Sequence, residues 1–269
     1  MNPSNGDGAI GIFDSGFGGL TVARQIMERM PNESIIYLGD TARLPYGTKS
    51  PATVIRYAQA CSEILTQRGI KLLVVACNTA SAHAIPALQT ANSIPVIGVV
   101  DPGAHCAVNA TKKGPIGIIG TQGTINSQVY RDAIHALTPE AEVVSVPCPL
   151  FVPLAEEGWT TGSVPTQIAH HYLDAIMQHE IDTLVLGCTH YPLLAETIQQ
   201  VVSDRVTLVD SASSTSGAVE EVLRGLNQLA LPEEHAIHEY LVSDDPEKFR
   251  QLGEQFLGQP IDSVEWLDF

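Results

Sequence analysis

Two cysteines, Cys77 and Cys188, lie at matching points of the sequence, 111 residues apart. Each ends a short apolar run that is typical of a buried strand, and each is followed by two hydrogen-bonding side chains. A thiol at a strand-to-helix turn meets backbone N–H groups and the positive end of a helix dipole, which lower its pKa from about 8.5. A single free cysteine is more often a small buried residue, but a matched pair favours a chemical role.

A pair of thiols suits the inversion of a stereocentre by proton transfer. One face of the carbon needs a base and the opposite face needs an acid, and the roles exchange in the reverse reaction. A thiolate also needs a neighbour that stabilises it, and the candidates are Asp14 for Cys77 and His190 or Glu156 for Cys188. Structural roles stay open at this point. Asp14 could cap a helix, His190 could be a satisfied buried histidine, and Glu156 or its neighbour Glu157 could be a surface acid.

The two thiols belong to a faint internal repeat. Gly11 and Gly117 lie in similar apolar runs, 106 residues apart, and each run leads into a polar turn and a helix-like stretch. The expected strand ends at Asp101 and Asp210 match at an offset of 109. Short Val/Ile/Leu runs without alternation indicate strands buried on both faces, as in a parallel sheet. We therefore predict an α/β fold with two pseudo-symmetric, doubly wound domains and mainly parallel sheets.

Strands and helices are expected to alternate along the chain. The predicted strands are 9–13, 34–38, 71–76, 95–100, 238–242 and 263–269. The predicted helices are 19–30, 52–68, with Ser50 and Pro51 as its start, 79–91, 125–137 and 246–257. The first domain is expected to comprise residues 1–100 plus 211–269, and the second residues 101–210.

Ligands of such sheets bind at the carboxyl ends of the strands, so we expect the active site in the cleft between the two domains. Polar and thiol side chains at these ends are the candidates for the site: Asp14, Ser15, Asp40, Cys77, Asn78, Asp101, Thr121, Cys188, Thr189 and His190.

Composition excludes several classes of protein. A formal net charge of −16 would repel a phosphate backbone, so nucleic acid is not expected as the main partner. The apolar runs are far shorter than the roughly 20 residues of a membrane-spanning helix, so no membrane is expected either. The first eight residues lack the features of a secretory signal, and five cysteines without a C-x-x-C pair fit a reducing compartment. We expect a cytoplasmic protein.

Motifs for cofactors and metals do not match. The Gly-rich turn after Asp14 departs from G-x-G-x-x-G, because Thr21 stands where the last glycine is required, and no P-loop motif occurs. The two-residue spacing of Cys188 and His190 fits no common zinc pattern. We predict neither a cofactor nor a metal.

Several sequence blocks together resemble the aspartate/glutamate racemase family, and within it the bacterial glutamate racemases. The blocks are Ile12–Gly19, Tyr37–Thr41, Pro45–Gly47, Ala76–Ala80, Cys148–Leu154 and Gly187–Pro192. The resemblance implies that the protein interconverts L- and D-glutamate without pyridoxal phosphate and supplies D-glutamate for peptidoglycan. It leaves a homodimer open as the assembly.

The resemblance also implies roles for individual residues. Cys77 would exchange the proton of the D-isomer and Cys188 that of the L-isomer, while Glu156 is preferred over Glu157 as the acidic helper. The residues that match substrate-contact positions are Asp14, Ser15, Pro45, Tyr46, Gly47, Cys77, Asn78, Thr79, Thr121, Thr124, Cys188, Thr189 and His190.

Three alternatives remain at this point. The first is a cofactor-independent racemase of another amino acid such as aspartate. The second is a thiol hydrolase or transferase that uses Cys188 with His190 and has no need of Cys77. The third is a binding protein without catalysis, which would leave the paired thiols without a purpose.

Overall fold

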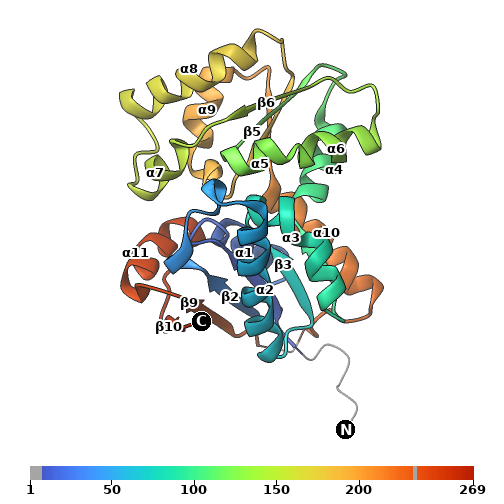
Figure 1. Ribbon diagram of the computed structural model, residues 1–269, viewed down its shortest axis with the longest axis vertical. Coiled ribbons are helices and arrows are strands. Elements are labelled where there is room, and N and C mark those ends of the chain that lie inside the picture. The colour runs from blue at the N-terminus through green and yellow to red at the C-terminus, as the bar shows by residue number, and fades with distance from the viewer. Residues whose placement is uncertain (1–7, 233–234) are drawn as a thin grey trace. The chain divides into compact units, whose positions relative to one another are not determined.

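The computed structural model describes residues 8–232 and 235–269 (Figure 1). The chain divides into two compact units, one that extends to Val99 and resumes at Ala212, and one that spans Val100–Ser211. The domain boundaries expected at residues 100 and 210 stay a prediction. The first seven residues, on which the expectation about a secretory signal mostly depends, lie outside the described residues.

The first unit contains a sheet with the strand order β10-β9-β2-β1-β3-β4, in which the pairs are parallel. Its strands are β1 (Ile10–Asp14), β2 (Ile35–Gly39), β3 (Leu72–Val75), β4 (Val96–Gly98), β9 (His238–Val242) and β10 (Glu265–Trp266). The three strands β1, β2 and β3 are buried along their whole length, as the non-alternating apolar runs predict.

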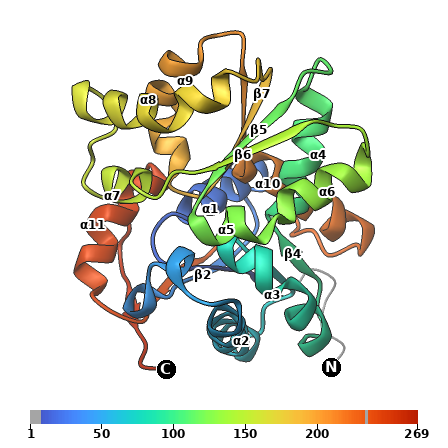
Figure 2. The ribbon, with the colours of Figure 1, turned by 45° about the horizontal axis from the view of Figure 1, so that its top comes forward.

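Helices cover both faces of this sheet (Figure 2). On one face, α2 (Pro51–Gln67) and α3 (Asn78–Ala91) pack on Phe13 and Leu73. On the other, α1 (Leu20–Arg29) contacts α11 (Pro246–Leu257), and Phe249 of α11 packs on Tyr37. The helix α10 (Ser211–Gly225) begins at the unit boundary.

Local sequence explains where α2 begins. Ser50 is its N-cap, with a side chain that accepts a hydrogen bond from the N–H of Thr53, and Pro51 occupies the first helical position. Proline suits that position because its missing N–H would have no partner in the helix. The predicted start of this helix is confirmed to within one residue.

The second unit contains a parallel sheet with the order β6-β5-β7-β8. Its strands are β5 (Ile116–Gly120), β6 (Val143–Pro147), β7 (Thr183–Gly187) and β8 (Thr207–Asp210). One face is covered by α4 (Val100–Ala110) and α6 (Val129–Leu137), and α8 (Ser163–Met177) packs with α9 (Ala195–Val202) (Figure 2). The short helices α5 (Gln122–Ser127) and α7 (Phe151–Glu156) follow β5 and β6.

The strand orders confirm the predicted repeat. The order β2-β1-β3-β4 in one sheet corresponds to β6-β5-β7-β8 in the other, position by position. Gly11 and Gly117 occupy the same place in β1 and β5, and a Cβ on either would lie within 3 Å of an isoleucine, Ile70 or Ile181. Close packing against the residues just before the paired strands β3 and β7 thus requires glycine in both halves.

Three details differ from the prediction. Strand β4 ends at Gly98, so Asp101 lies exposed in the first turn of α4 rather than at a strand end; Pro102 is tolerated there because a first helical turn needs no N–H donor. The helix expected over 125–137 is interrupted at Gln128, which has a φ of 58°. The last strand is reduced to β10, two residues long.

No helix within residues 8–232 and 235–269 is both long and apolar enough to cross a membrane.

Candidate functional site

Cys77 lies between β3 and α3, where it is the N-cap of the helix. Its Sγ accepts a hydrogen bond from the N–H of Ala80 at 3.5 Å, and its thiol donates to Ser15 Oγ at 3.7 Å. The residue is only 5% exposed. The amide and the helix N-terminus both favour a negative charge on the sulfur, so this cysteine has the surroundings of a reactive thiol.

Asp14 ends β1 in the same unit as Cys77 and is fully buried. The N-cap of α1 is Gly19, and the Oδ2 of Asp14 accepts a hydrogen bond from the N–H of Gly16 at 2.9 Å. Burial raises the pKa of Tyr37 well above its ordinary value, and the charges of Asp14 and Cys77 add to this effect. The carboxylate of Asp14 and the thiol of Cys77 therefore both influence the buried hydroxyl of Tyr37.

The absence of a side chain at Gly19 leaves space for the side chain of Asp14. A Cβ at this position would lie 2.5 Å from the Cβ of Asp14 and 2.9 Å from both the Cβ of Ala76 and the hydroxyl of Tyr37. Close packing around the carboxylate therefore requires glycine at this position of the turn.

The remaining predicted contacts in the first unit differ in exposure. Asn78 and Thr79 open α3 and are both buried, whereas Ser15 is half-buried. Pro45 is exposed, and Gly47 lies in the short 3-10 helix η2 (Tyr46–Thr48).

Tyr46 is buried, and its hydroxyl donates to Asp40, a fully buried carboxylate that also accepts from Ser243 Oγ at 2.8 Å. The hydroxyl of Tyr46 is thus committed to the protein, which leaves its backbone as the part that can meet a ligand. Sequence reasoning missed Ser243, since nothing in the tail indicates that it reaches Asp40, 203 positions away.

Cys188 follows β7 in the second unit, and its Sγ lies 3.9 Å from His190 Nδ1. The opposite ring nitrogen, Nε2, lies 3.1 Å from Glu156 Oε1. Cys188 and His190 are both about 6% exposed. The three side chains therefore form a continuous chain in which a carboxylate orients a ring that faces a thiol.

The two candidate acids have different surroundings. Glu156 is the last residue of α7 and contacts His190, whereas Glu157 lines an apolar pocket of about 340 Å³ together with Trp159. Adjacent helical positions point about 100° apart, so only one of the two can face the histidine.

Hydroxyl groups gather at the same end of the second sheet. Thr121 is the N-cap of α5, and its Oγ1 accepts from the N–H of Thr124 at 3.3 Å while the two hydroxyls lie 3.1 Å apart. Thr124 and Thr189 are buried. Thr121 follows β5 as Ser15 follows β1, which places neutral donors at matching points of the repeat.

The two thiols are not equivalent. Cys77 starts a long helix, whereas Cys188 is followed by the 3-10 helix η3 (Tyr191–Leu194) before α9 begins. The predicted strand-to-helix turn is confirmed at Cys77, whereas at Cys188 the helix that follows the strand is a 3-10 helix with Pro192 in its first turn. The neighbour of the Cys188 thiol is the ring of His190, whereas that of the Cys77 thiol is an amide of the helix N-terminus.

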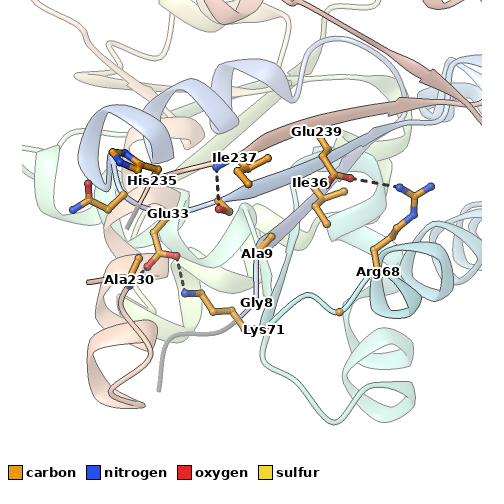
Figure 3. A pocket seen from close by; sticks show the side chains of 13 residues that line it. Gly8, Ala9, Glu33, Ile36, Arg68, Lys71, Ala230, His235, Ile237 and Glu239 are labelled. Carbon is orange, nitrogen blue, oxygen red and sulfur yellow. Dashed lines mark hydrogen bonds and ion pairs between the residues drawn. The ribbon is translucent and has the colours of Figure 1, made fainter. Parts of the chain in front are cut away.

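Among the described residues, no group of three or more His, Cys, Asp and Glu side chains could hold a metal ion. A pocket of about 420 Å³ lies at the other, amino-terminal edge of the first sheet (Figure 3). Its charged residues pair with one another, Lys71 with Glu33 at 2.7 Å and Arg68 with Glu239 at 3.5 Å. Of the described residues that line it, none belongs to the predicted site.

Comparisons with known proteins agree on one family. Residues 20–219 match the model of the Asp/Glu/Hydantoin racemase family. A glutamate racemase from Geobacter metallireducens is 54% identical over 256 residues, with 95% of each chain covered. A crystal structure of a glutamate racemase isoform from Bacillus anthracis is 41% identical with a TM-score of 0.94, covering 98% of each chain. One from Francisella tularensis, in complex with D-glutamate, is 39% identical with a TM-score of 0.91, covering 97% of each chain.

Proposed function

This chain belongs to the Asp/Glu/Hydantoin racemase family, and we propose that it is a glutamate racemase that interconverts L- and D-glutamate without a cofactor. The product D-glutamate would serve peptidoglycan synthesis in the cytoplasm. The observation that carries the proposal is a buried thiol at the same point of both halves of the repeat, Cys77 beside the Ala80 amide and the Ser15 hydroxyl and Cys188 beside His190. Such a pair supplies one acid and one base for a single carbon.

In the proposed mechanism each thiol serves one isomer. The thiolate of Cys188 removes the α-proton of L-glutamate, and the thiol of Cys77 delivers a proton to the opposite face of the carbanion, which yields D-glutamate. Cys188 is then protonated and Cys77 is a thiolate, so the same pair runs the reverse reaction with the roles exchanged. The proton count of the enzyme is unchanged by each turnover.

The partners of the thiols support these roles in different ways. The Ala80 amide and the helix N-terminus favour a negative charge on Cys77, and Asp14 is the charged group that we assign to that side. On the other side, His190 stabilises the charge on Cys188 when it is protonated, and Glu156 orients its ring.

An anionic substrate in a protein with a net charge of −16 needs neutral donors close by. The hydroxyl, amide and backbone groups that we assign to substrate binding come from Ser15, Asn78, Thr79, Thr121, Thr124, Thr189 and the turn Pro45–Gly47. Such groups bind a carboxylate without adding a field of positive charge. We also propose a homodimer as an assembly that sedimentation velocity can test.

Substrate identity can be tested by circular dichroism with L-glutamate, D-glutamate, L-aspartate and D-aspartate in parallel. We expect the optical signal of both glutamate isomers to decay to zero and that of both aspartate isomers to persist. Faster racemisation of aspartate would replace glutamate with aspartate in the proposal, and a stable signal from all four would reject racemase activity.

The acidic helper can be tested with two neighbouring variants. Glu156→Gln removes the charge that orients His190, so we expect kcat to fall about tenfold, less than the ~10²–10⁴-fold loss for a group that transfers the proton itself. Glu157→Gln is the matched control, because this side chain faces the apolar pocket, and its kcat should stay within about twofold of the wild type. The assignment is wrong if the larger loss belongs to Glu157→Gln.

A further inference from the structure

Tyr191 follows His190 directly and is fully buried. Its N–H donates to the carbonyl of Cys188 at 3.1 Å, and its hydroxyl donates to the carbonyl of Cys148 at 2.8 Å. Burial and the charge of Cys188 raise the pKa of Tyr191 well above its ordinary value, so the hydroxyl stays a donor throughout the physiological range. This one residue therefore ties the segment of Cys188 and His190 to a distant part of the chain.

The carbonyl oxygen of Cys148 accepts two hydrogen bonds. Besides the hydroxyl of Tyr191, it accepts the N–H of Phe151 at 3.1 Å, and Phe151 is the first residue of α7. The N–H of Cys148 in turn donates to the carbonyl of Gly120 at the end of β5. The start of α7 and the side chain of Tyr191 thus share one acceptor that is fixed to the sheet.

Aromatic rings join the same two segments. The ring of Phe151 meets that of Tyr191 edge-on, with centroids 5.3 Å apart and an interplanar angle of 88°. The ring of Phe151 also meets that of Tyr172 of α8, with centroids 5.5 Å apart and an interplanar angle of 83°, and the hydroxyl of Tyr172 accepts the N–H of Leu150 at 3.3 Å. Edge-to-face pairs of this kind favour one relative orientation of the rings. They hold α7, whose last residue is Glu156, against the segment that carries His190.

We infer that Tyr191 is a positioning residue that holds His190 and Glu156 in register with Cys188. The inference rests on the proposed function. In this role Tyr191 touches neither a reacting atom nor the substrate. Through its contacts with Cys148 and Phe151 it fixes the position of both residues of the contact between His190 and Glu156. Its loss should therefore slow proton transfer at Cys188 and leave proton transfer at Cys77 unaffected.

The test is Tyr191→Phe, which keeps the ring and removes the hydroxyl. We expect kcat/KM to fall about 3- to 10-fold, the range for loss of one buried hydrogen bond. The equilibrium constant between enantiomers is 1, so kcat/KM must fall equally in both directions in any variant. The diagnostic readout is the primary isotope effect on kcat/KM with each α-deuterated isomer.

The two isotope effects should move in opposite directions. Deuterated L-glutamate loses its deuteron to Cys188, so a slower step at Cys188 raises the isotope effect for this isomer. Deuterated D-glutamate loses its deuteron to Cys77. A slower later step at Cys188 makes this removal less rate-limiting and therefore lowers the isotope effect for the D-isomer. A merely structural role reduces the amount of active enzyme, which leaves both isotope effects unchanged. Unchanged isotope effects, or a shift in the same direction for both isomers, would overturn the inference.

Tyr37→Phe is the matched control in the first unit. The hydroxyl of this buried tyrosine donates to the carbonyl of Gly16 at 2.9 Å, and the N–H of Gly16 donates to Asp14. We expect the reverse pattern, a lower isotope effect for the L-isomer and a higher one for the D-isomer. Tyr240→Phe removes a hydroxyl from β9 and should shift neither.

A second variant tests the same inference if Tyr191→Phe does not fold. Phe151→Leu keeps an apolar side chain and removes the edge-on ring contact, and it should shift the isotope effects in the same direction as Tyr191→Phe. A shift in the direction seen for Tyr37→Phe would contradict the inference. If wild-type protein does not racemise glutamate at all, the proposed function fails instead, and this outcome is distinct because it appears before any variant is compared.

Discussion

Replacing either Cys77 or Cys188 by serine is expected to lower the rate of glutamate racemisation by about 10²- to 10⁴-fold. A serine hydroxyl has almost the shape of the thiol but is far less acidic, so it cannot alternate between base and acid near neutral pH. Both residues are nearly fully buried and small, so the serine variants should fold. The loss is measured as the initial rate in both directions by circular dichroism.

Each variant should also retain half of the chemistry. In Cys77→Ser, Cys188 can still remove and return the proton of L-glutamate, so deuterium from heavy water should enter L-glutamate without inversion. Cys188→Ser should do the same with D-glutamate. Cys106→Ser, which changes a half-buried cysteine of α4, is the control and should racemise at the wild-type rate. An active Cys77→Ser variant would contradict the two-thiol mechanism and favour a single nucleophile at Cys188.

Lys71→Met is expected to lower the free energy of unfolding by about 3–5 kcal/mol, a large loss for a residue outside the proposed site. Lys71 and Glu33 are 3% and 2% exposed and their charged atoms lie 2.7 Å apart (Figure 3). Lys71 Nζ also donates to the carbonyl of Gln228 at 2.8 Å, and Glu33 accepts the N–H of Ala230 at 2.7 Å. Without the lysine, the carboxylate of Glu33 would be buried with its main counter-charge removed. Urea unfolding followed by circular dichroism measures the change.

Two further variants serve as comparisons for this prediction, one at the same buried pair and one at a more exposed pair. Glu33→Leu combined with Lys71→Met removes both charges and should recover much of the loss, because paired apolar replacements of buried ion pairs are often nearly neutral. Arg68→Met breaks the more exposed contacts with Glu239 and Glu265 and should cost less than about 1 kcal/mol. If Lys71→Met lowers the free energy of unfolding by less than Arg68→Met does, the buried pair does not stabilise this edge of the sheet.

The sheets could be predicted from the sequence because their signal is local. Runs such as Leu72–Val75 and Leu184–Leu186 are short and wholly apolar, and a parallel strand between two helix layers requires such a run. The repeat added further evidence, since two matched runs are harder to explain by chance than one. The boundaries of α11 and β9 were predictable for the same reason, because polar turns flank both.

Other features depend on contacts that no local pattern contains. Asp101 was expected at a strand end, but its helix starts early because β4 has only three residues. The choice between Glu156 and Glu157 depends on the rotation of α7, which the packing of Phe151 determines. The hydrogen bond from Tyr191 to Cys148 joins residues 43 positions apart, and only the fold brings them together. The block from Cys148 to Leu154 contributed to the family resemblance, yet the sequence offers no role for its residues.

The most direct test of two-thiol racemisation is the isotopic composition of both glutamate isomers early in the reaction of L-glutamate in heavy water. If Cys188 removes the proton and Cys77 delivers another from the opposite face, the first D-glutamate formed carries deuterium at the α-carbon, while the remaining L-glutamate carries hydrogen. D-glutamate that retains the original hydrogen, or L-glutamate that exchanges as fast as it inverts, would mean that one base serves both faces and would contradict the account.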